Sequence, residues 1–207
     1  MLLHQPLATI TPTVDADILQ VLAAADQPFT GRQLAGLIPQ RSTRGVTRAL
    51  QRLVDHGIVH VAPAGNANLY QLNRQHLAAD HIVALSRLRD TLAERISDHV
   101  EHWQQPADLV VLFGSAARNQ MGLDSDIDLF VVSDRVGAEA WDAQAHQLAQ
   151  QVRTWTGNDC RILEMTPQQV TDGAGDDPVL AEIARDGQTL YGDASLLRRA
   201  RAAAKGL

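Results

Sequence analysis

The chain has 207 residues, of which 45% are hydrophobic, so it can build a core and is not a disordered chain. Its single cysteine, Cys160, excludes a disulfide scaffold and a cysteine-ligated zinc cluster, and it is typical of the reducing cytoplasm where we expect the protein. No apolar run approaches the length of a membrane span, so no membrane partner is expected. The net charge of −6 argues against nucleic acid only if the charge is evenly spread.

The charge is distributed unevenly along the chain. Residues 1–75 contain six arginines and four aspartates, whereas the rest of the chain contains 12 basic and 20 acidic side chains. Such asymmetry favours two modules with different partners. We expect an α+β protein with an N-terminal domain over residues 1–75, a long connecting helix over 76–105 that opens the second domain, the body of that domain over 106–195 and a tail over 196–207.

Three helices followed by a hairpin are predicted for the first module. Residues that cap helices, each followed by apolar residues at helical spacing, mark the three starts. The predicted starts are Thr13 or Asp15, then Thr30, and then Ser42 or Thr43. Two short apolar stretches, 58–61 and 69–72, predict strands, and the Gly65-Asn66 pair between them predicts the turn.

The third predicted helix, which ends at His56, has one apolar side and one side rich in arginine. Exposed arginines on a helix suit phosphate contacts and hydrogen bonds to base edges. The segment "STRGVTRALQRLVDHG" (42–57) and the hairpin strand 69–73 resemble the winged helix-turn-helix family of bacterial regulators. The resemblance implies double-stranded DNA as a partner, with contacts from Arg41, Thr43, Arg44, Arg48, Arg52 and Asn66. In the alternative, the arginines only solvate the helix, or the module joins proteins.

A single amphipathic helix is predicted from Arg74 to about Trp103, because apolar residues recur at helical spacing and nothing breaks the pattern. His99 and His102 on this helix have a spacing that could bind a metal, but no metalloprotease carboxylate motif accompanies them. We therefore favour a solvated or dimer-facing helix, which leaves a homodimer open.

The second module begins with a buried strand over 109–113, which is followed at once by Gly114 and Ser115. Ten residues later, Asp126 and Asp128 lie two apart at the start of a second apolar strand, so both carboxylates project from one face. Paired carboxylates suit Mg²⁺, which prefers oxygen ligands and keeps positions for phosphate oxygens. A glycine and a serine at a short helix start suit phosphate, so the spacing favours phosphoryl or nucleotidyl transfer.

The segment "GSAARNQMGLDSDIDLFVV" resembles the signature of the polymerase-beta-like nucleotidyltransferases, especially their minimal group. The resemblance extends over roughly residues 80–192 and implies a mixed sheet with flanking helices, a third strand over 160–163 and a closing helix and turn over 180–192. It implies that Asp126 and Asp128 are catalytic and bind Mg²⁺, and that ATP or another nucleoside triphosphate lies at Gly114, Ser115 and Arg118. A nucleoside monophosphate would pass to a hydroxyl of a protein partner or an RNA, in a toxin–antitoxin setting.

The sequence departs from that family at the third strand, where active members usually have a third carboxylate. Arg161 occupies that position, while Asp159 shares its strand face and Glu164 points to the opposite one. We expect Arg161 to lower the pKa values of the two aspartates and either to take the metal's place or to hold the triphosphate. Asn119 replaces a glycine that is common in the family, and asparagine can adopt the left-handed conformation that this position would need.

Two other functions remain open, and Arg161 favours the first of them. The first is a DNA-binding transcriptional regulator whose nucleotidyltransferase-like domain is catalytically silent and serves as a sensor or dimerisation unit. The second is a protein-binding antitoxin that needs neither DNA nor Mg²⁺. The acceptor, the nucleotide preference and the operator are not specified by the sequence.

Overall fold

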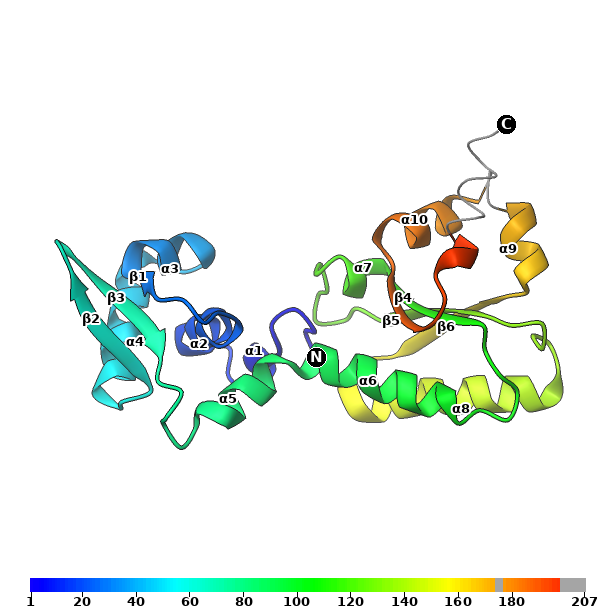
Figure 1. Cartoon of the computed structure of the whole chain (residues 1–207), viewed down its shortest axis with the longest axis horizontal. Helices are drawn as coiled ribbons and strands as arrows, with labels where there is room; N and C mark the ends of the chain where they lie inside the picture. Colours follow the sequence, from blue (N-terminus) through cyan, green and yellow to red (C-terminus); the bar gives the residue numbers. More distant parts are fainter. Residues whose placement is uncertain (174–176, 198–207) are drawn as a thin grey trace. The chain divides into compact units, whose positions relative to one another are not determined.

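The computed structural model describes residues 1–173 and 177–197. These residues form an α+β structure with one three-stranded and one four-stranded sheet (Figure 1). The chain forms two compact units, the first mainly His4–Arg89 and the second mainly the chain from Asp90 onwards. The tail expected over 196–207 lies outside the described residues from position 198. Within the described part of the chain, no helix has the length and apolar character needed to cross a membrane.

The first unit has the three predicted helices and the predicted hairpin, two short elements that the sequence did not indicate, α1 (Pro6–Ile10) and β1 (Phe29–Thr30), and α5 (Ala79–Ser86), which lies within the predicted connecting helix. Its other elements are α2 (Val14–Ala24), α3 (Gly31–Leu37), α4 (Thr43–Asp55), β2 (Val59–Ala64) and β3 (Ala67–Leu72). The strands form an antiparallel sheet in the order β1-β3-β2. Only two residues form β1, which exists because Phe29 pairs with Tyr70, a contact that local spacing cannot reveal.

Local hydrogen bonds set the starts of α3 and α4. Thr30 and Gln33 form a reciprocal capping box at the start of α3, and Ser42 Oγ accepts the amide of Gly45 at the start of α4. The apolar side of α4 is buried against α2 and α3. Its buried residues are Val46, Ala49, Leu50 and Leu53, which share a core with Ile18, Leu22 and Leu34. The opposite, arginine-rich side of α4 is exposed, as the spacing predicts.

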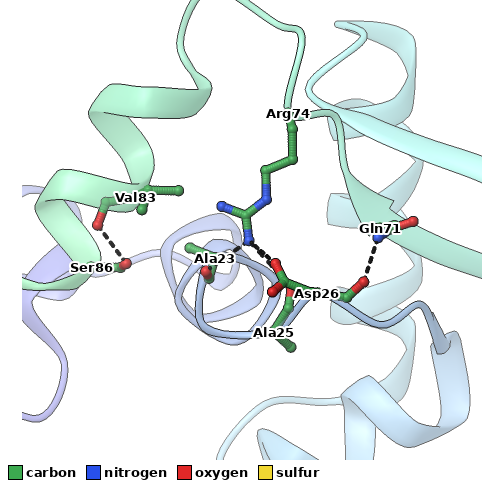
Figure 2. A network of polar contacts seen from close by, with 7 residues as sticks. All are labelled: Ala23, Ala25, Asp26, Gln71, Arg74, Val83 and Ser86. Carbon is green, nitrogen blue, oxygen red and sulfur yellow. Dashed lines mark hydrogen bonds and ion pairs between the residues drawn. The ribbon is translucent and has the colours of Figure 1, made fainter.

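Arg74 ties the segment after β3 to the end of α2 (Figure 2). Its Nη2 donates to the carbonyl oxygens of Ala23 and Ala25, at 3.2 and 3.4 Å, and pairs with Asp26 Oδ1 at 3.1 Å. Gln71 Nε2 donates to the Asp26 carbonyl oxygen at 2.7 Å. The guanidinium thus satisfies carbonyl groups that the helix end leaves without partners.

Arg74→Ala should lower the free energy of unfolding by about 0.5–1.5 kcal/mol, because carbonyl groups at the end of α2 lose their donor. The Asp26 side chain is fully exposed, so the ion pair itself contributes little. Urea unfolding monitored by circular dichroism measures the change. Arg32→Ala, which removes an exposed arginine of α3, is the matched control and should leave the unfolding midpoint unchanged. Equal effects of the two substitutions would contradict the capping role.

The prediction of a single helix over Arg74–Trp103 is wrong, because this segment forms two helices, α5 and α6 (Leu88–Glu101). Arg87 has φ −106° and ψ 17°, and its amide donates to the Ala84 carbonyl oxygen at 3.2 Å, which closes α5. The Ser86 hydroxyl also donates to the Val83 carbonyl oxygen, at 2.8 Å. Such local hydrogen bonds compete with the helix without a glycine or proline to reveal them in the sequence.

The second unit is built on a mixed sheet in the order β6-β5-β4-β7. Its elements after α6 are β4 (Leu109–Phe113), α7 (Gly114–Ala117), β5 (Ile127–Val132), α8 (Glu139–Thr156), β6 (Cys160–Met165), α9 (Pro167–Gly173), α10 (Pro178–Asp186) and β7 (Gln188–Gly192). β4 runs antiparallel to β5 and β7, whereas β5 and β6 are parallel. Residues of β4 and β5 are buried on both faces, as their continuous apolar runs predict.

Helices cover both faces of this sheet (Figure 1). Residues of α9 and α10 share a core with Val111, Phe130 and Val132 on one face. On the other face, the Trp141 Nε1 of α8 donates to Glu164 Oε1 of β6 at 2.7 Å. The closing helix and turn expected over 180–192 are in fact α10 and a strand, β7, because residues 188–192 pair with the open edge of β4.

Candidate functional site

The strands β4, β5 and β6 bring the predicted site residues together at one end of the sheet. Phe113, the last residue of β4, lies opposite Asp128 of β5, and Asp128 lies opposite Arg161 of β6. Asp126 immediately precedes β5, two residues before Asp128, so the two carboxylates share a face of the sheet. That face is the one that α9 and α10 cover.

Gly114 follows β4 directly and lies against the carboxylate of Asp128. Its φ is +67°, which L side chains rarely adopt, so the turn from β4 into α7 requires a glycine. A Cβ at this position would lie 3.3 Å from Asp128 Cγ and closer still to Oδ2, a distance that real Cβ atoms essentially never show. The glycine therefore makes room for the carboxylate, and no other residue type fits without displacing it.

The environment of Asp128 raises the pKa of its carboxyl group above the ordinary value. Burial is the largest cause, and the negative charge of Asp126 adds to it. Arg161 lowers this pKa, as expected, and Arg118 does the same, but the two arginines do not outweigh burial, so the pKa is raised overall. Burial and the same two aspartates raise the pKa of the Cys160 thiol to about 12, which leaves it protonated and unreactive at neutral pH.

Arg161 pairs with the other aspartate. Its Nη2 lies 2.6 Å from Asp126 Oδ2, which places a cation directly on the carboxylate. The two alternative carboxylates, in β6 and just before it, have other partners: Glu164 accepts the Trp141 indole on the opposite face, as its spacing predicts. Asp159 pairs with Arg153 at 3.3 Å and is 65% exposed. The position of the missing third carboxylate is therefore occupied by a positive charge.

Arg118 lies close enough to Asp128 to lower its pKa, and Ser115 follows Gly114 in α7. Arg118 forms an ion pair with Glu182 of α10, and its Nε donates to Gln120 Oε1 at 3.3 Å. Glu182 also raises the pKa of Asp128, so it belongs to the electrostatic environment of the site although sequence reasoning missed it. Ser115 lies half-buried in α7, and Asn119 adopts the predicted left-handed conformation with φ 58°.

Two carboxylates make a donor set that fits Mg²⁺ with a nucleotide, because Mg²⁺ is commonly bound by one or two carboxylates together with substrate phosphates. Among residues 1–173 and 177–197, no group of three or more His, Cys, Asp or Glu side chains is arranged to hold a metal by itself. The two histidines of α6 make other contacts: His99 packs edge-on against Trp155, and His102 Nδ1 lies 2.7 Å from the Asp98 carbonyl oxygen.

The candidate DNA contacts in the first unit fall into two groups. Arg41 pairs with Asp17 at 2.6 Å and donates to the Pro12 carbonyl oxygen, and Arg52 pairs with Asp15. Both arginines thus have partners within their own unit. The remaining candidates, which are exposed and without an ion-pair partner in the described part of the chain, are Thr43, Arg44 and Arg48 on α4 and Asn66 at the tip of the hairpin.

Within the second unit lies a segment that matches a family model, and the chain is also similar to solved structures. Residues 89–157 match the family model "Nucleotidyltransferase domain". A solved structure of a toxin–antitoxin with AMP-PNP is 16% identical over 53% of this chain and 77% of its own, with a TM-score of 0.36. A mutant of the toxin–antitoxin MntA-HpeT is 15% identical over 55% of this chain and 81% of its own, with a TM-score of 0.38. No curated protein sequence matches the chain. The segment 89–157, which includes Gly114, Ser115, Asp126 and Asp128, is thus the part of the chain that matches a nucleotidyltransferase domain model.

Proposed function

We propose that this protein is a Mg²⁺-dependent nucleotidyltransferase that transfers a nucleoside monophosphate from ATP or another nucleoside triphosphate to a hydroxyl of a protein or an RNA. The observation that carries the proposal is the contact of the Gly114 backbone with the Asp128 carboxylate, beside Asp126, inside the segment that matches the family model. Two carboxylates beside a glycine backbone support this proposal, because carboxylate oxygens suit Mg²⁺ and a glycine lets phosphate groups approach the backbone closely.

In this proposal, Asp126 and Asp128 hold the metal, while Gly114 and Ser115 lie at the phosphates. When bound, Mg²⁺ supplies Lewis-acid chemistry by withdrawing charge from the phosphate oxygens. The acceptor hydroxyl oxygen bonds to the α-phosphorus, the bond from that phosphorus to the bridging oxygen breaks, and pyrophosphate leaves. The hydroxyl proton passes to water. Arg118 adds positive charge at the edge of the site, where its pairing with Glu182 fixes its side chain.

The test is transfer of label from nucleoside triphosphates labelled at the α-phosphate. The full chain is incubated with Mg²⁺ and each of the four labelled ribonucleotides, with total RNA in one arm and the product of the adjacent gene in another. We expect label to appear in one of these two acceptors and pyrophosphate to be released in equal amount. Absence of nucleotide binding by calorimetry, together with absence of label in both arms, would overturn the proposal. The adjacent-gene arm also tests the toxin–antitoxin setting.

We propose in addition that residues 1–75 form a winged helix that binds double-stranded DNA. Arg44 and Arg48 favour this second function, because they are exposed on the side of α4 that faces away from the core and have no acidic partner in the described chain. Asn66 lies at the tip of the β2–β3 hairpin, the position of a wing. A regulator with a catalytically silent second unit is the alternative, and the Arg161–Asp126 ion pair is the feature that favours it.

Arg48→Ala should weaken binding to promoter DNA roughly tenfold and reduce the dependence of the binding constant on salt, because one phosphate or base contact is lost. Titration of the chain's own promoter fragment by fluorescence anisotropy at several salt concentrations measures both effects. Arg32→Ala is the control. If Asp126→Asn leaves promoter regulation in cells intact while Arg48→Ala abolishes it, the silent-domain alternative is supported. If the unmodified chain shows no salt-dependent affinity for the fragment, the winged helix does not bind DNA.

A further inference from the structure

We propose that Arg161 is an exchangeable counter-cation: it neutralises Asp126 when the site holds no metal and moves to the triphosphate when the metal–nucleotide complex arrives. The inference rests on the proposed function and identifies a residue that sets the order of binding. With Arg161 on Asp126, the bare metal ion would bind weakly, and the site would bind the metal–nucleotide complex instead.

The position of Arg161 is fixed by the sheet. It lies directly opposite Asp128 in the parallel β5–β6 pair, and its guanidinium reaches past that residue to Asp126, with 2.6 Å between Nη2 and Oδ2. The Asp126 side chain is only 21% exposed, so its negative charge gains from a partner held close to it. The ion pair therefore gives the Asp126 carboxylate a cationic partner before any metal is bound.

A metal ion and the guanidinium compete for this carboxylate. The guanidinium lies on Asp126 Oδ2, one of the oxygens that would ligate the metal, and two cations at one oxygen repel each other. Because the contact sits at the edge of the sheet with a largely exposed arginine, it is weak enough to be broken. A bare divalent ion must displace the arginine without compensation, whereas a metal–nucleotide complex offers the arginine a new anion.

The arginine is free to make that move. Its side chain is 77% exposed, and Asp126 is its one ion-pair partner in the described part of the chain. By contrast, Arg118 is held by both Glu182 and Gln120. The planar guanidinium can donate two parallel hydrogen bonds to phosphate, which makes a triphosphate a better partner than one oxygen of a carboxylate.

The test measures two separate affinities, of Mn²⁺ without nucleotide and of ATP in the presence of a chelator. In Arg161→Ala, Mn²⁺ should bind roughly three- to tenfold tighter than in the unmodified protein, because the competitor is gone, and metal-free ATP should bind weaker by a similar factor. Electron paramagnetic resonance of free Mn²⁺ gives the first affinity and calorimetry the second. Arg161→Gln, which retains a hydrogen-bonding side chain, should show both changes.

Arg153→Ala is the matched control, because Arg153 is 71% exposed and pairs with Asp159 rather than with Asp126. It should leave both affinities unchanged. Unaltered Mn²⁺ affinity in both Arg161 variants would overturn the competition, and unaltered ATP affinity would overturn the transfer to phosphate. If neither the unmodified protein nor any of the variants binds Mn²⁺–ATP, the proposed function itself fails, and the inference fails with it.

Discussion

Asp128→Asn should reduce nucleotide transfer by roughly 10²–10³-fold, the scale of losing one preorganised electrostatic contact at a reacting group. The asparagine side chain has nearly the same shape, but it lacks the negative charge that draws the metal to this carboxylate. Because Gly114 leaves room for the side chain at position 128, the substitution should fit without a backbone shift. The loss is therefore expected in metal and nucleotide binding as well as in transfer.

The same substitution should not lower thermal stability. In the folded protein, burial and Asp126 raise the pKa of the Asp128 carboxyl group above its value in the unfolded chain. Folding therefore disfavours the charged form, and the unmodified protein loses stability as the pH rises through that pKa. Asparagine removes this cost, so Asp128→Asn should melt at the same or a higher temperature at neutral pH. The gain should disappear in acid, where the carboxyl group is already neutral.

Label transfer and differential scanning fluorimetry measure the two effects on the same preparation. Asp134→Asn, which neutralises an exposed aspartate just beyond β5, is the control and should change neither. Asp126→Asn should lose transfer to a similar degree, but without the same gain in stability, because it also breaks the ion pair with Arg161. Full transfer activity in either site variant would contradict the assignment of these carboxylates.

The sequence could predict the parts of the site that depend on local spacing. Gly114, Asp126 and Asp128 lie within 15 positions of one another, at the ends of two strands whose apolar runs are unbroken. Once those strands pair, the three residues must meet. Arg161 is predicted from the resemblance to the family's third strand, and the parallel register of β5 and β6 puts it opposite Asp128. Period-two spacing also predicts that Glu164 points away from the site.

The parts that could not be predicted depend on packing between distant segments. The Arg118–Glu182 pair joins residues 64 positions apart, and it exists only because α10 packs beside α7. The ion pairs of Arg41 and Arg52 with Asp17 and Asp15 likewise depend on how α2 and α4 pack. A helical periodicity shows which side of α4 is polar, but it does not show which of its arginines already have acidic partners.

Two acidic residues of α2 limit which arginines are available to contact DNA. Of the four arginines between positions 41 and 52, Arg41 and Arg52 already have their charge compensated within the unit. Phosphate contacts made by these two would first have to break an ion pair, whereas Arg44 and Arg48 would not. The proposed DNA contact is therefore concentrated on the first half of α4, which is the part that Ser42 caps.

Gly114→Ala should abolish metal-dependent nucleotide binding at a modest cost in stability. Alanine at position 114 must keep the positive φ, which costs about 1–2 kcal/mol, and its Cβ would overlap Asp128 Oδ2. That oxygen is the end of a side chain, so the carboxylate can rotate away and relieve most of the overlap. The fold then survives, but Asp128 no longer points where the metal and the phosphates would lie.

Gly157→Ala is the control that separates these two effects. Gly157 has φ +76°, close to that of Gly114, and a Cβ there would meet nothing within 4 Å. Both variants should therefore lose a similar amount of free energy of unfolding, while only Gly114→Ala loses Mn²⁺–ATP binding. Urea unfolding and calorimetry give the two quantities. If Gly114→Ala binds Mn²⁺–ATP as well as Gly157→Ala does, the close approach of the Gly114 backbone to Asp128 has no role in nucleotide binding. The proposed activity would then lose its main structural support.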